Sequence, residues 1–186
     1  MDEMAIYDLP AMVDYVLAKT GHPSLYYVGH SQGVMTMWIK LSKDQAFGAK
    51  IRKFFALAPA SRMAHVKGVF FYTSQIYEQY KLMYNLFGDG EFFPNSVFAS
   101  AMADILCDKT VNKLCEDFIF SVVGPNSNQF NMSRLGIYMA HDPAGTSSRN
   151  MLHFAQMINT KRFAPFDRGV DGNLRWYGTV SLSNLT

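Results

Sequence analysis

The stretch that decides the fold is Leu25-Tyr26-Tyr27-Val28-Gly29-His30-Ser31-Gln32-Gly33. Its first half contains aromatic and β-branched residues, which are typical of a buried strand. After it, apolar residues recur at the spacing i, i+3, i+4 and i+7, which makes one face of a helix reaching about Lys43; they are Val34, Met37, Trp38 and Leu41. The stretch therefore predicts a strand, a tight turn and a helix in succession.

The turn of this stretch, Gly29-His30-Ser31-Gln32-Gly33, matches G-x-S-x-G, the pattern of a nucleophile elbow. Such a turn strains the backbone of its central residue, and glycines on either side avoid a collision. The pattern predicts that Ser31 is a catalytic nucleophile and that the Gln32 N–H, at a helix N-terminus, stabilises an oxyanion. His30, at the variable position, is expected to support the site rather than act as the base. The alternative is a glycine-rich turn with a surface serine, and the flanking strand and helix favour the elbow.

The flanks of the turn predict a partial α/β core over residues 1–65. Asp8 is expected to cap a helix that runs to about Thr20, where Gly21 ends it. The apolar run Phe54–Pro59 predicts a second strand. A strand, a helix and a strand at this spacing form a βαβ unit, so the two strands should be parallel.

The rest of the chain has a different pattern. Residues 66–158 carry many aromatic side chains at irregular helical spacing, which predicts a mostly helical cap, or lid, with helices near 98–106 and 111–119. Residues 159–186 contain one proline and several glycines and are expected to be a loop-rich segment returning to the core.

Composition excludes several classes of function. The net charge of +2 gives no reason to expect a nucleic-acid partner. No apolar run is long enough to span a membrane, and no signal sequence opens the chain. No metal-ligand or nucleotide-binding motif is present, so neither a cofactor nor a metal is expected. The 15 Phe, 10 Tyr and 12 Met indicate either a large core or an apolar surface for a lipid.

Five motifs occur in an order that resembles the acid lipases, the group of gastric and lysosomal acid lipase. They are Tyr7-Asp8-Leu9-Pro10-Ala11, residues 27–33, Ala56-Leu57-Ala58-Pro59, Asn131-Met132-Ser133-Arg134 and His141-Asp142-Pro143-Ala144-Gly145-Thr146-Ser147. The resemblance covers essentially the whole chain, although the family usually has Asn at position 142. It implies an α/β-hydrolase core, a helical cap and hydrolysis of triacylglycerols or cholesteryl esters. It also implies a lysosomal or extracellular location and transient contact with a lipid droplet or membrane surface.

The catalytic partners of Ser31 are the missing part of this chemistry. A serine hydrolase needs a histidine base and a carboxylate that orients it, and in α/β-hydrolases both follow the serine. In the family resembled, both lie beyond residue 186, so the chain is expected to be a central fragment or an abbreviated gene product. Alone it is expected to be poorly folded and inactive. Order-compatible pairs within the chain fall in the expected cap, where histidines more often have packing roles; they are Asp104 or Asp117 with His141, and Asp142 with His153.

Cys107 and Cys115 are expected to form a disulfide. On one continuous helix their Cα atoms would be about 12 Å apart, too far for a bond, so a break near residues 108–110 is required. The family resembled has a cap disulfide in this region; two free thiols are the alternative. Asn131 and Asn184 begin glycosylation sequons and indicate the secretory route. The rival to an enzyme is a non-catalytic lipid-binding or interaction protein that retains the lipase cap.

Overall fold

The computed structural model describes residues 1–92, 117, 120, 124, 130–134, 137–138, 141 and 144–185. The chain divides into two compact units. The first combines Met1–His65 with Gln156–Thr186, and the second is Val66–Ala155. The first unit contains the predicted strands and the turn at Ser31.

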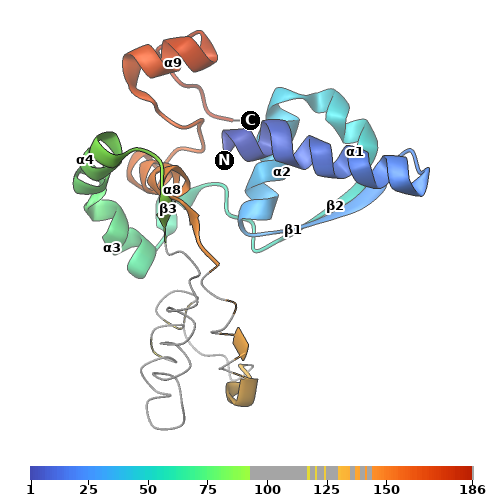
Figure 1. The fold of residues 1–186 in the computed structure, drawn as a ribbon, viewed down its shortest axis with the longest axis horizontal. Helices are drawn as coiled ribbons and strands as arrows, with labels where there is room; N and C mark the ends of the chain where they lie inside the picture. Colours follow the sequence, from blue (N-terminus) through green and yellow to red (C-terminus); the bar gives the residue numbers. More distant parts are fainter. Residues whose placement is uncertain are drawn as a thin grey trace. The chain divides into compact units, whose positions relative to one another are not determined.

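A pair of parallel strands forms the centre of the first unit. Strand β1 (Leu25–His30) pairs with β2 (Ile51–Leu57), with Tyr27 opposite Phe54. Between them the chain forms helix α2 (Gln32–Lys43) and a 3-10 helix (Gln45–Lys50). The predicted strand, helix and parallel strand are therefore confirmed (Figure 1).

Helix α1 (Leu9–Thr20) precedes β1, but the predicted cap at Asp8 is wrong. Asp8 has helical dihedral angles, φ −70° and ψ −49°, its side chain caps nothing, and a π-helical segment (Met4–Asp8) leads into it. The helix extends upstream because Ala5 and Leu9, four residues apart, are both buried on one face. The predicted end is confirmed, since Gly21 has φ 68° and donates its N–H to the Leu17 carbonyl at 2.9 Å.

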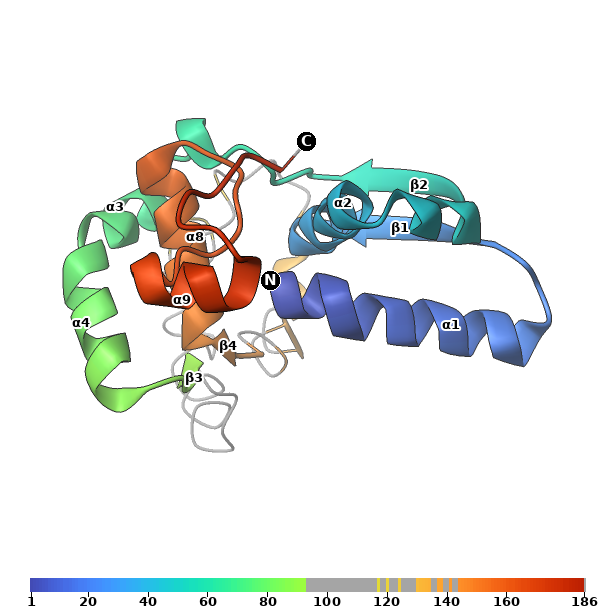
Figure 2. The same cartoon turned by 90° about the horizontal axis from the view of Figure 1, so that it is seen from above.

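One face of the β1–β2 pair is covered by α1, α2 and the 3-10 helix (Figure 2). The buried cluster between these elements consists of Leu9, Val13, Met37 and Phe47. Leu25 and Tyr27 of β1 pack against it from alternate positions, because successive strand residues point to opposite faces. On β2 the packed residues are Ile51 and Phe54, three positions apart, because the register of the pair shifts between Leu25 and Tyr26. This core packs β1 and β2 against α1 and α2.

A helix that the sequence analysis did not predict, α9 (Gly169–Tyr177), lies in the segment expected to be loop. The loop prediction is wrong for these nine residues. The glycines lower the helix propensity of this segment, so its sequence did not indicate a helix. Side-chain hydrogen bonds at the start of the helix compensate for the low propensity. The Asp167 carboxylate accepts from the Gly169 N–H at 2.9 Å and from Asn173 Nδ2 at 2.8 Å. Gly178, with φ 69°, ends it.

Asp2 joins this returning segment to the rest of the first unit. Its side chain is 2% exposed and accepts from Lys43 Nζ at 2.9 Å. It also accepts from the Phe166 N–H and the Tyr177 hydroxyl, each at 3.2 Å. Burial and the nearby Asp2 charge raise the pKa of Tyr177 to about 12, so its hydroxyl remains a donor at ordinary pH.

The second unit contains α3 (Val69–Gln75), α4 (Tyr77–Phe87) and a short antiparallel pair, β3 (Glu91–Phe92) with β4 (Thr146–Ser147). Helix α8 (Ser148–Thr160) follows β4 directly and continues past Ala155. The helix predicted near 98–106 lies outside the described residues, as does the one near 111–119 apart from Asp117.

Asp89 provides a cap for the start of α8 from a distant part of the sequence. Its Oδ1 accepts from Ser147 Oγ at 2.9 Å and Ser148 Oγ at 3.1 Å, and Oδ2 lies 2.9 Å from an Arg149 nitrogen. Burial raises the pKa of the Asp89 carboxyl, but these hydrogen bonds and the Arg149 charge outweigh it and hold the pKa below its usual value. A negative charge at a helix N-terminus also interacts favourably with the helix dipole.

Candidate active site around Ser31

Ser31 occupies the sharp turn between β1 and α2. Its backbone has φ 49° and ψ −112°, a conformation that residues with side chains rarely adopt. Holding it costs on the order of 1–3 kcal/mol, so the surroundings must enforce it. The Ser31 N–H donates to the Leu57 carbonyl at 3.0 Å, and the Ser31 carbonyl accepts from the Val34 N–H at 3.1 Å. These two bonds attach the turn to both β2 and α2.

At Gly29 the backbone of β1 lies very close to the backbone at the start of α2. A Cβ atom at this position would lie 2.9 Å from the Val34 nitrogen and 3.0 Å from the Gly33 carbonyl carbon. Both are backbone atoms, so no change of side-chain rotamer could relieve the contact. At Gly33 a Cβ atom would meet only the Tyr27 hydroxyl, at an ordinary 3.7 Å. The first glycine of the motif is therefore required by packing, and the second is not.

Two contacts that the sequence analysis missed secure the first turn of α2. The Tyr27 hydroxyl donates to the Gly33 carbonyl at 2.9 Å, and burial raises the pKa of Tyr27, which keeps that hydroxyl protonated. Gln32 Nε2 donates to the Met4 sulfur at 3.1 Å. Tyr27 could be predicted only as a strand residue, and nothing in the sequence pattern indicates a role for Met4.

Helix α2 gives the turn a rigid support and a partial positive charge. Four of its side chains are fully buried, which fixes its position in the unit; they are Val34, Met35, Met37 and Ile39. Its N-terminus begins at Gln32, directly after the half-buried Ser31. Backbone N–H groups at a helix N-terminus favour an anion. The arrangement can thus hold a hydroxyl next to a place where negative charge is stabilised.

Curated relatives match nearly the whole chain. Lipase lipl-1 of Caenorhabditis elegans is 42% identical over 185 residues, which are 97% of this chain and 46% of the relative. Bovine gastric triacylglycerol lipase is 39% identical over 189 residues, 100% of this chain and 47% of the relative. Human lysosomal acid lipase/cholesteryl ester hydrolase is 40% identical over 169 residues, 90% of this chain and 42% of the relative.

The chain is a homologue of the acid lipases. The family resemblance predicted from the five motifs is confirmed, since the relatives that match nearly the whole chain are named as lipases. The chain spans about half the length of the curated relatives that it matches. No protein-family model matches it.

The other predicted residues of this acid-lipase homologue belong to different parts of the chain. His30 ends β1 and is exposed. Asp117, His141 and His153 belong to the second unit, whereas Ser31 belongs to the first. Asp104 and Asp142 lie outside the described residues, as do Cys107 and Cys115, so the disulfide stays a prediction.

The two predicted glycosylation residues are both exposed. Asn131 Oδ1 accepts from the Ser133 N–H at 3.1 Å and from Ser133 Oγ at 2.7 Å. Asn184 Oδ1 accepts from Arg162 Nε at 3.0 Å. Among the described residues, no set of His, Cys, Asp and Glu side chains is arranged to hold a metal, and no helix there is long and apolar enough to cross a membrane.

Proposed function

We propose that this acid-lipase homologue carries the nucleophile of a serine ester hydrolase, with Ser31 as the residue that is acylated. Gly29–Gly33 would be its nucleophile elbow, and the Gln32 N–H one donor to the oxyanion. The substrates would be lipid esters, since the relatives are named for triacylglycerol and cholesteryl ester hydrolysis. The strained backbone of Ser31, φ 49° between a strand and a helix, is the observation that carries the proposal.

The strain supports the proposal because it has no evident packing purpose of its own. An ordinary serine in a loop could relax to a common conformation and lower the free energy of the folded state. Here Leu57 and Val34 hold its backbone by hydrogen bonds, and Gly29 lets the start of α2 approach. A nucleophile must be presented at a fixed angle to a substrate, and such a turn provides that angle.

The reaction would proceed in two halves. Ser31 Oγ attacks the ester carbonyl while its proton passes to a histidine, and the negative charge that develops on the carbonyl oxygen lies at the N-terminus of α2. The C–O bond to the alcohol then breaks, and the histidine returns the proton to the leaving alcohol. Water, activated by the same histidine, hydrolyses the acyl-enzyme and releases a fatty acid. We assign the histidine and its carboxylate to no residue of this chain.

The proposal includes passage through the secretory pathway to a lysosomal or extracellular location. The exposure of Asn131 and Asn184 supports their use as glycosylation acceptors. An oxidising compartment would also allow the predicted bond between Cys107 and Cys115. Contact with a lipid droplet or membrane surface would be transient, as the substrate is released from it.

The test compares Ser31→Ala with Ser183→Ala in the full-length protein. Ser183 is an exposed serine of the same unit and serves as the matched control. A fluorophosphonate probe should label the wild type and Ser183→Ala but not Ser31→Ala, and hydrolysis of a short-chain nitrophenyl ester should follow the same order. Thermal unfolding should be similar for all three, because only one hydroxyl is lost.

Two outcomes would contradict the proposal. Equal labelling of Ser31→Ala would place the nucleophile elsewhere. No labelling or turnover by the folded wild type would favour the non-catalytic lipid-binding alternative.

A further inference from the structure

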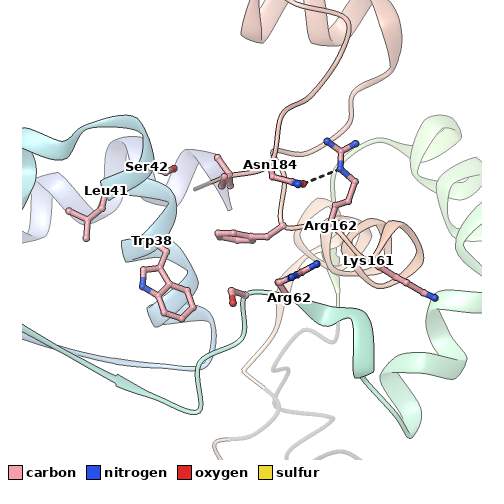
Figure 3. Close-up of a pocket in the computed structure, with 10 residues that line it drawn as sticks. Trp38, Leu41, Ser42, Arg62, Lys161, Arg162 and Asn184 are labelled. Atoms are coloured by element: carbon pink, nitrogen blue, oxygen red, sulfur yellow. Dashed lines mark hydrogen bonds between the residues drawn. The ribbon is translucent and has the colours of Figure 1, made fainter.

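A pocket of about 550 Å³ lies in the first unit, beside the second half of α2 (Figure 3). Residues 61–62, 161–163 and 184–185 line it together with α2. Its size falls within the range typical of small-molecule sites, about 300–1,000 Å³. Ser31 is not among its lining residues, so its chemistry is separate from that of the turn.

One wall of this pocket is apolar. It consists of Trp38 and Leu41 from α2, with Phe163 and Leu185 from the returning segment. On its other side the Trp38 ring packs against Phe54, with ring centroids 6.3 Å apart, which fixes the position of the indole. The Leu185 N–H donates to the Phe163 carbonyl at 2.8 Å and holds these two residues together. Such a wall suits a hydrocarbon chain.

The remaining lining carries positive charge and no carboxylate. Arg62, Lys161 and Arg162 line the pocket, and none of its lining residues is acidic. Figure 3 shows Arg62 among the lining side chains, whereas the Lys161 side chain extends away from Trp38 and Leu41. Within the part of the chain that the structure describes, Arg62 and Lys161 form no ion pair.

Two details show that the cationic segment is held in place. Arg162 donates to Asn184 Oδ1 at 3.0 Å and to the Leu182 carbonyl. Lys161 has φ 56°, in the left-handed region that residues with side chains rarely occupy. The backbone thus keeps neighbouring cations beside an apolar wall at the cost of some strain.

We propose that this pocket binds a fatty-acid anion, with the tail against Trp38, Leu41, Phe163 and Leu185 and the carboxylate at Arg62, where Lys161 adds positive charge at the rim. Charge complementarity selects an anion, and the apolar wall selects one with a hydrocarbon tail. That the anion is a product of this protein's own ester hydrolysis rests on the proposed function. The pocket would then hold the released acid away from Ser31.

The expected effects follow from the two halves of the pocket. Exposed ion pairs contribute less than about 1 kcal/mol each, so removing the charges of Arg62 and Lys161 should weaken carboxylate binding by roughly three- to tenfold. The affinity for an alcohol with the same tail should be unchanged by these substitutions. Each buried methylene contributes about 0.8 kcal/mol, so decanoate, which has two more methylenes, should bind up to about fifteenfold more tightly than octanoate.

The experiment is isothermal titration calorimetry of decanoate, octanoate and 1-decanol, below their aggregation limits, into the full-length protein. The double variant Arg62→Gln, Lys161→Gln should bind decanoate roughly three- to tenfold more weakly and 1-decanol unchanged. Lys53→Gln removes an exposed lysine of the same unit that does not line the pocket, and should match the wild type. Ser61→Phe, which fills the pocket, should abolish binding of both ligands, with thermal unfolding as the check on folding.

Two results would overturn the proposal that the pocket binds a fatty-acid anion. Decanoate binding that is insensitive to both the charge variant and Ser61→Phe would place the acid elsewhere and overturn the proposal. Inorganic phosphate that binds as tightly as decanoate would show an anion site without selection for a tail, which also overturns it. The titration is repeated with Ser31→Ala, which should bind decanoate like the wild type. Failure at the pocket would leave probe labelling of Ser31 intact, so the two proposals fail separately.

Discussion

Replacing Gly29 with alanine should move the start of α2 and disturb Ser31. The added Cβ would lie 2.9 Å from the Val34 nitrogen, whereas contacts of at least 3.4 Å are ordinary. The helix must therefore shift by about 0.5 Å, the difference between these two distances. The obstacle is backbone, so the strain cannot be relieved by a flexible side chain.

The size of the effect can be worked from this shift. Overpacking in a close-packed region costs about 1–3 kcal/mol, and we expect about 2 kcal/mol less free energy of unfolding for Gly29→Ala. Because a misplacement of about 1 Å can reduce a rate about a hundredfold, half that shift should slow labelling of Ser31 about tenfold. Stability and reactivity should thus fall together.

Gly33→Ala is the matched control, since it makes the same chemical change four residues away. Its Cβ would meet only the Tyr27 hydroxyl at 3.7 Å, and Gly33 lies in the first turn of α2. Alanine favours a helix over glycine by up to about 1 kcal/mol, so this variant should be as stable as the wild type or slightly more stable. Its labelling rate should be unchanged.

Both variants would be measured in the full-length protein by urea unfolding and by the rate of fluorophosphonate labelling. The steric reasoning is refuted if Gly29→Ala unfolds at the same urea concentration as the wild type. It is also refuted if Gly33→Ala is destabilised as much as Gly29→Ala. A stable Gly29→Ala protein that labels at the normal rate would show that the turn has more freedom than its geometry implies.

Two further predictions concern buried or capping carboxylates. Asp2→Ala should lower the free energy of unfolding by about 3 kcal/mol in urea, because Lys43 loses its partner and the buried Phe166 N–H loses an acceptor; a change below about 1 kcal/mol would contradict this. Asp89→Asn should cost about 1 kcal/mol at pH 7, after discounting for solvent at a side chain that is 37% exposed. The pKa of the Asp89 carboxyl is lower in the folded protein than in the unfolded chain, where it is about 4, so the charged carboxylate stabilises the folded state at pH values above about 4. This stabilisation is lost as the pH falls through the folded-state pKa, so the difference in free energy of unfolding between Asp89→Asn and the wild type should narrow from about pH 6 towards about pH 3. A difference that stays constant over this range would contradict the prediction.

Sequence reasoning located β1, α2 and β2 because each is specified by residues close together in the chain. Tyr26, Tyr27 and Val28 favour a strand, and the apolar spacing after Ser31 favours a helix whatever surrounds them. The motif indicated Ser31 for a similar reason, since the steric demand of the turn acts between Gly29 and residues only four or five positions away. Local interactions of this kind produce sequence patterns, so they can be predicted without knowledge of the tertiary structure.

Tertiary structure decided the features that depend on residues far apart in the chain. Asp2 and Phe166 are 164 positions apart, and Asp89 caps a helix that begins 59 residues later, so no periodicity relates these partners. Helix α9 was hidden because glycine lowers its local propensity, while its stabilising bonds come from Asp167 and Asn173 side chains. Arg62, Lys161 and Trp38 likewise line one pocket only because folding brings their segments together. A sequence specifies such contacts through the balance of many packing energies, and these become visible only when distant segments are brought together.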